Sequence, residues 1–170
     1  LLSWGHARVC GTLEVERFRA QQEAVTAKTT APLLQVDDEI KVGTQLDFPV
    51  FNRAAPMLAT CRYVGERAYV FVEESMWDDN GGPLVTRDVE SLSVLFDSAT
   101  PADPDRGIFQ LCSETFGEPV DADGEAKIFI VLLQIGSNNI LGFFDRAVST
   151  HQDPALRRDA VYLEANEVWL

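Results

Sequence analysis

An almost unbroken apolar run at residues 127–133 constrains the fold of this chain more than any other feature. It reads Lys-Ile-Phe-Ile-Val-Leu-Leu, and no polar residue interrupts it after the lysine. A strand with one face in water alternates apolar and polar residues, whereas a strand covered on both faces does not. The run therefore predicts a central, buried strand in a sheet with material packed on both sides.

Other segments supply neighbours for this strand. Met57–Val64 and Ala68–Val72 are rich in β-branched and aromatic residues, and the turn at Gly65 between them predicts an antiparallel hairpin. Leu46–Phe51 begins with strand alternation, and Pro49 places it at a sheet edge. Three further segments are predicted to be extended: Ile108–Cys112, Ile140–Phe144 and Ala160–Leu163.

Residues 86–97 predict the main helix, with Thr86 as the expected N-cap. Apolar side chains recur at helical spacing on one face: Val85, Val89, Leu92 and Phe96. A strand, a helix and a second strand in this order predict a parallel βαβ crossover from Ala68–Val72 to the 128–133 strand. Together with the hairpin, this gives a mixed α+β or α/β fold, in which one main crossover helix packs on a twisted mixed sheet.

The first 35 residues form a separate unit in this prediction. Glu14–Ala27 contains good helix formers but only a thin apolar stripe, so it predicts either a marginal helix or an extended arm. Pro32 lies in a predicted linker near residues 28–36. The mixed-sheet domain is then expected to span residues 36–170. Because the first residue is not Met, we expect a processed or partial chain.

The charge of the chain excludes several classes of partner. The formal net charge is -13, and no basic patch is available for nucleic-acid phosphates. The same acidity disfavours anionic membrane surfaces, and no run of 18 apolar residues suggests a membrane span. We therefore expect no nucleic-acid and no membrane partner. Cation binding by some of the carboxylates is compatible with this composition.

Histidines and cysteines are few and widely spaced. The two histidines, His6 and His151, lie in unrelated segments and form no zinc-ligand pattern. The three cysteines permit one disulfide with one free thiol, or three free thiols, and a free cysteine is expected to be buried. They are Cys10, Cys61 and Cys112, and their pairing stays open.

The strongest metal candidate is a calcium site at residues 121–125. Asp121, Asp123 and Glu125 occupy alternate positions around Gly124, and a glycine turn allows carboxylates to converge on a hard cation. An EF-hand would require an acidic residue at the twelfth position of the loop, where Leu132 stands instead. The alternative for this segment is a solvated β-turn.

The order of several motifs resembles the N-terminal half of secreted bacterial zinc metallopeptidases of the zincin class, the hyicolysin-like group. The similarity extends over about residues 40–166 and depends on the order and spacing of the motifs. They are Cys61–Trp77, Leu95–Asp97, Phe116–Gly124, Lys127–Leu133, Gly142–Asp145 and Val161–Leu163. Residues 1–35 lie outside the resemblance.

In that family the last strand of the sheet is followed by a helix with His-Glu-x-x-His, in which both histidines bind zinc and the glutamate is the general base. Residues 1–170 contain no such motif, so no catalytic residue is assigned, and zinc is expected only if the chain continues beyond Leu170. The resemblance implies that this chain supplies the sheet and one wall of the cleft. Leu141, Gly142 and Phe143 would then belong to the edge segment that pairs with extended substrate.

Two hypotheses follow. In the first, the chain is part of a secreted or cell-surface metallopeptidase, a hydrolase whose partner is a peptide or protein substrate or the remaining part of the same protein. In the second, it is a degenerate zincin module without catalysis, acting as a protein-binding or structural domain. A reading frame that continues into His-Glu-x-x-His favours the first hypothesis, and a stop codon favours the second. Composition alone leaves a cytoplasmic location open.

Overall fold

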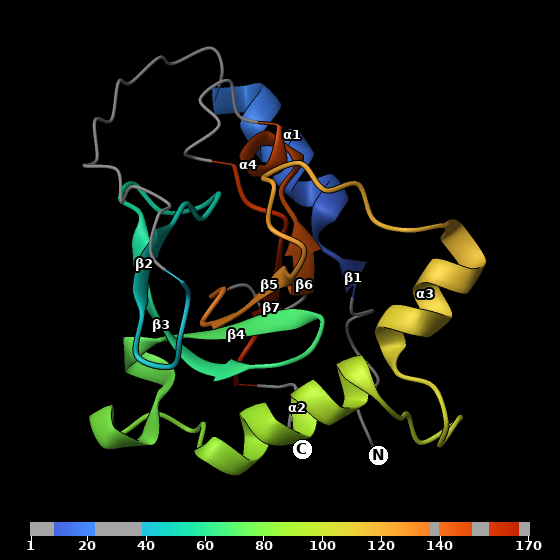
Figure 1. Cartoon of the computed structure of the whole chain (residues 1–170). Coiled ribbons are helices and arrows are strands. Elements are labelled where there is room, and N and C mark those ends of the chain that lie inside the picture. The colour runs from blue at the N-terminus through green and yellow to red at the C-terminus, as the bar shows by residue number, and fades with distance from the viewer. Residues whose placement is uncertain (1–8, 23–38, 137–139, 151–156, 167–170) are drawn as a thin grey trace, which may run out of the picture.

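One mixed sheet organises the molecule (Figure 1). The computed structural model describes residues 9–22, 39–136, 140–150 and 157–166. Within these ranges seven strands form the sheet in the order β1-β6-β7-β5-β4-β3-β2. They are β1 (Val9–Cys10), β2 (Gln45–Phe48), β3 (Met57–Val64), β4 (Ala68–Glu73), β5 (Ile128–Leu133), β6 (Ile140–Phe144) and β7 (Ala160–Glu164).

The apolar run forms β5, and its central position is confirmed. β5 lies between β4 and β7 and runs parallel to both. Phe129, Val131 and Leu133 point into one core, while Ile130 and Leu132 point into a second core on the opposite face. All five are buried, which explains why the segment shows no polar alternation.

Helices cover both faces of the sheet. α2 (Thr86–Asp97) packs through Val89 and Leu92 on the core that contains Ile130, as the helical spacing predicts. α1 (Thr12–Gln22) inserts Val15 into the other core, and Figure 1 shows α1 and α2 on opposite sides of the sheet. The remaining helices are α3 (Ile108–Phe116), α4 (Arg146–Ser149) and two short 3-10 turns, η1 (Glu74–Met76) and η2 (Asp78–Asn80).

The connections match the predicted hairpin and crossover. β3 and β4 are antiparallel neighbours joined at Gly65, and β2 adds antiparallel to β3 as a short edge strand before Pro49. β4 and β5 are parallel, and the chain between them contains α2. The coarse expectation of a mixed α+β fold with a mixed sheet is therefore confirmed.

Two details of the sequence prediction are wrong. Ile108–Cys112, expected as a strand, is the first part of α3, because Ile108, Leu111 and Cys112 follow the i, i+3, i+4 spacing of a helix. The crossover therefore contains two helices, and α3 packs on α2 through an edge-to-face contact of Phe109 with Phe96. The N-cap of α2 is Val85, not Thr86, and the Asp88 carboxylate accepts a hydrogen bond from the Val85 amide.

The N-terminal residues join the sheet. β1 pairs with β6, and α1 follows directly over the same end of the sheet. The predicted linker at 28–36 lies outside the described residues. Among the helices of the described ranges, none has the length and hydropathy that crossing a membrane requires.

Candidate functional site

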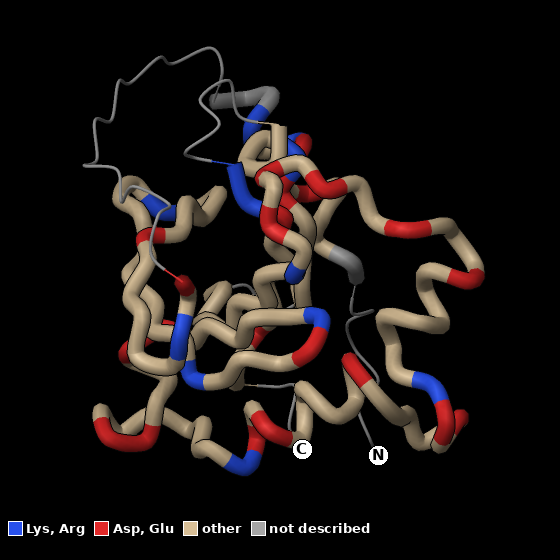
Figure 2. Tube along the Cα trace, viewed as in Figure 1, with Lys and Arg blue, Asp and Glu red and all other residues tan. Residues whose placement is uncertain are grey.

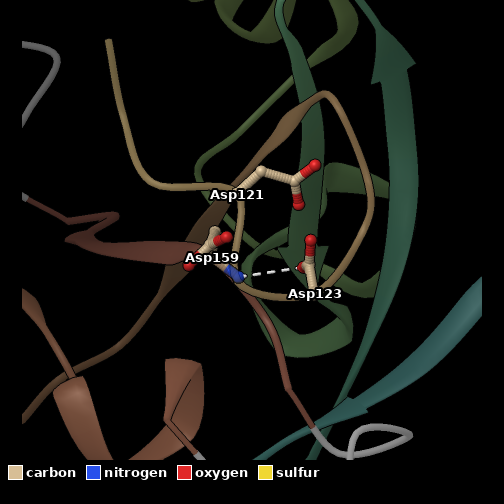
Figure 3. Close-up of side chains that lie close together, drawn as sticks. All are labelled: Asp121, Asp123 and Asp159. Carbon is tan, nitrogen blue, oxygen red and sulfur yellow. Dashed lines mark hydrogen bonds between the residues drawn. The ribbon is translucent and has the colours of Figure 1, made fainter. Parts of the chain in front are cut away.

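Three carboxylates meet where the chain enters β5 and β7 (Figure 3). Asp121 and Asp123 lie in the loop before β5, and Asp159 is the residue before β7. Because β5 and β7 are parallel and Phe129 pairs with Ala160, the residues preceding the two strands arrive at the same edge of the sheet. One oxygen of each carboxylate lies within 4.8 Å of the other two.

Hydrogen bonds within this acidic cluster hold the loop to the start of β7. Asp123 Oδ2 accepts from the Asp159 amide at 3.0 Å, and Asp159 Oδ2 accepts from the Ala122 amide at 2.7 Å. Asp121 Oδ1 accepts from the amide of Gly124, whose φ of 83° is the left-handed conformation that glycine adopts without strain. These hydrogen bonds from backbone amides to the carboxylates therefore hold the turn in place without a bound cation.

The electrostatics of the cluster favour an added positive charge. Burial raises the pKa of Asp159, and the neighbouring Asp123 and Asp121 raise it further, although the hydrogen bond from the Ala122 amide opposes them. Arg158 already offsets part of the repulsion among the three carboxylates, since it interacts electrostatically with Asp123. Three carboxylate oxygens match the hard ligands that calcium prefers, with further oxygens left to carbonyls and water. Calcium binding here stays a prediction.

The structure changes the membership of the proposed site. It brings Asp121 and Asp123 together, as the sequence suggested, and adds Asp159, which sequence reasoning missed. Glu125 is not in the cluster. It lies instead beside Tyr69, where burial and then the Glu125 carboxylate raise the pKa of the Tyr69 phenol to about 12. Figure 2 shows the other described carboxylates distributed over loops, helices and strands.

The predicted substrate segment forms β6. Gly142 and Phe143 pair with Leu163 and Tyr162 of the antiparallel strand β7. Phe143 is buried and stacks on the Tyr162 ring at 4.6 Å, while Leu141 is partly exposed. On its outer side β6 pairs with the two residues of β1, which run parallel to it. Pairing with substrate stays a prediction.

Zinc does not fit the residues that the structure describes. His6 and His151 both lie outside the described ranges. Within those ranges the acidic cluster is the one group of three or more metal-ligating side chains, and it offers carboxylates without histidine or cysteine. Protein zinc sites are built mainly from histidine and cysteine, so no zinc chemistry is assigned to these residues.

The cysteines are separate from both sites. Cys61 and Cys112 carry free thiols. Cys61 is buried, and this burial raises the pKa of its thiol to about 11. Cys112 is exposed on α3, so the expectation that each free cysteine is buried is wrong at this position, because α3 packs against α2 along one side only.

Comparison with known proteins adds no assignment. No protein-family model matches the chain, and no curated protein is found to be similar to it.

Proposed function

We propose that this chain is the sheet portion of a zincin-type zinc metallopeptidase and that it holds extended polypeptide along β6. The position of β6 carries the proposal. It is antiparallel to the neighbouring parallel strands β7, β5 and β4, and it lies second from one edge of the sheet, covered there by the two residues of β1. An extended chain can be added at such an edge. The residues that the family resemblance assigns to substrate pairing, Leu141–Phe143, belong to this strand.

Strand addition gives this site its chemistry. An extended peptide placed along β6 would exchange backbone hydrogen bonds with it and present alternate side chains to the two faces of the sheet. The Gly142 carbonyl and the Phe144 amide face outward and already bond to the N-terminal segment, so both are suited to an incoming backbone. Hydrolysis would require a His-Glu-x-x-His helix from polypeptide outside residues 1–170. Secretion belongs to the same proposal.

The alternative is a non-catalytic module that binds polypeptide through the same strand. It is favoured by the absence of a zinc-ligand set from the described residues and of His-Glu-x-x-His from the whole sequence. The peptidase and the binding module would both bind polypeptide along β6, and only the peptidase would hydrolyse it.

Sequencing the transcript through the codon for Leu170, combined with the intact mass of the purified natural protein, separates the two functions. We expect the reading frame to encode His-Glu-x-x-His soon after β7, and the purified protein to contain one zinc and to cleave a quenched fluorescent peptide. A stop codon without that motif, or a zinc-free protein that leaves peptides intact, would remove the peptidase and leave the binding module.

A further inference from the structure

Residues 9–19, called here the N-terminal arm, cover the outer edge of β6. The Gly11 amide donates to the Gly142 carbonyl at 2.7 Å, and the Phe144 amide donates to Thr12 Oγ1 at 3.1 Å. These bonds occupy the backbone groups through which an added strand would bind. The arm therefore occupies the position that an added polypeptide strand would take along β6.

Close approach of the arm depends on Gly11. A Cβ atom at this position would collide with Ile140 Cγ2 and would lie 3.1 Å from the Gly142 carbonyl oxygen. A larger residue would push the arm away from β6, because a Cβ would come within 2.4 Å of Ile140 Cγ2 while the Gly142 carbonyl, fixed in the backbone, closes the other side. The edge thus accepts a chain with glycine at the position whose amide donates to the Gly142 carbonyl, one residue after the Cys10 position that pairs with Gly142.

An ion pair between half-buried Arg19 and buried Asp145 anchors the far end of the arm. Arg19 of α1 donates through Nε to Asp145 Oδ2 at 3.0 Å, and the Asp145 side chain is only 1% exposed. Removing one partner of such a pair leaves an uncompensated buried charge. Val15 in the core and an edge-to-face contact of Phe18 with Phe51 complete the docking of α1.

The covered state also has weak points. β1 has two residues, and its register against β6 is irregular. On the neighbouring strand β7, the Tyr162 hydroxyl is buried without a hydrogen-bond partner, one of two such side-chain atoms within the described ranges. A buried polar group without a partner is destabilising, and Val15 of the arm packs in the same core as Tyr162.

We propose that the N-terminal arm is an intramolecular occupant of a strand-addition site on β6. A polypeptide that extends along β6, with a glycine whose amide donates to the Gly142 carbonyl and a basic side chain within reach of Asp145, would displace it. This inference rests on the proposed function, because it concerns the same edge. It adds that the chain blocks this edge itself, and that binding requires the arm to leave.

The test uses the complete chain with Gly11→Val. We expect the Phe144 amide to exchange with solvent at least about tenfold faster than in the wild type, with the amides of β5 unchanged, measured by NMR. A labelled peptide of residues 7–22 with Cys10→Ser should bind the variant at least about tenfold more tightly than the wild type, because an arm that closes the site lowers apparent affinity. The same peptide carrying Gly11→Val is the negative probe.

A second pair of variants on α1 gives an independent measure. Arg19→Met should open the arm in the same way, whereas Arg17→Met should not, since Arg17 pairs with Glu14 on the exposed side of the helix. Unchanged Phe144 exchange in both opening variants, faster exchange without peptide binding, or global unfolding of both would each overturn the proposal. None of these readouts involves zinc or hydrolysis. A protein that lacks zinc and peptidase activity would therefore disprove the peptidase without deciding whether the arm is displaced.

Discussion

At the scale of single residues, the two described thiols differ in reactivity. Cys112 is exposed, whereas burial holds the pKa of Cys61 at about 11. Since the thiolate is the reactive form, we expect one thiol to react with DTNB in native Cys10→Ser protein and two after denaturation. Adding Cys112→Ser should abolish the native reaction. Native reaction of Cys61 would contradict the packing of β3.

The Glu73 carboxylate gives a pH-dependent contribution to stability. Burial opposes its ionisation, but two hydrogen bonds from Arg53 and one from the Gln134 amide outweigh burial and lower the pKa of Glu73. A lowered folded pKa stabilises the fold above the unfolded value of about 4.3, and this contribution is lost as pH falls through the folded pKa.

We therefore expect Glu73→Gln to reduce the free energy of unfolding by about 1–2 kcal/mol at pH 7, and the difference from wild type to shrink below about pH 4. Urea melts across this range provide the measurement. Glu66→Gln is the control, because Glu66 pairs with Arg67 on the surface and should change stability by less than about 0.5 kcal/mol. A constant difference at every pH would contradict the role assigned to the charge.

The acidic cluster predicts stabilisation by calcium. With a dissociation constant of about 10⁻⁴ M, 1 mM calcium would add ~1.4 kcal/mol and raise the melting midpoint by roughly 3–6 °C relative to chelator. Asp159→Asn should lose most of this increment while keeping an oxygen for the Ala122 amide. Asp79→Asn, in the exposed η2 turn, should keep it. Identical midpoints with calcium and with chelator would leave only the structural role of the turn.

At the scale of elements, β5 carries more of the stability than its neighbours at the edge. Leu132 is fully buried between β4 and β7, so we expect Leu132→Ala to cost about 2–5 kcal/mol. Leu58→Ala is the matched control on β3, where the side chain is exposed, and it should cost less than about 0.5 kcal/mol. Equal losses in urea melts would refute the central position of β5.

Elements with a clear apolar pattern were predictable from sequence, including the short strands β6 and β7, whereas α3 and the two residues of β1 were not. β5 and α2 show continuous burial or a clear helical face, and both lie where the pattern placed them. α3 has nine residues and packs on α2 along a narrow strip, so its pattern is compatible with a strand. Asp159 was missed because its partners lie in a distant loop. An acidic residue directly before a strand parallel to β5 was the signal that could have identified it.

At the scale of the whole molecule, the order of the strands lies beyond any local pattern. β6 is next to β7 as a sequence neighbour would be, but β1 reaches it from the other end of the chain. Val9-Cys10 is too short to show periodicity, so neither this pairing nor the cover that it places over β6 could be read from residues alone. The edge of β6, which the sequence analysis assigned to substrate pairing, is therefore already paired with β1.

This long-range pairing has a consequence for biosynthesis. Val9 is synthesised about 130 residues before its partner Ile140. At typical translation rates the interval is on the order of ten seconds, far longer than helix or hairpin formation. β1 must therefore wait for β6 before it can dock, and β6 has no partner on its outer edge until β1 reaches it.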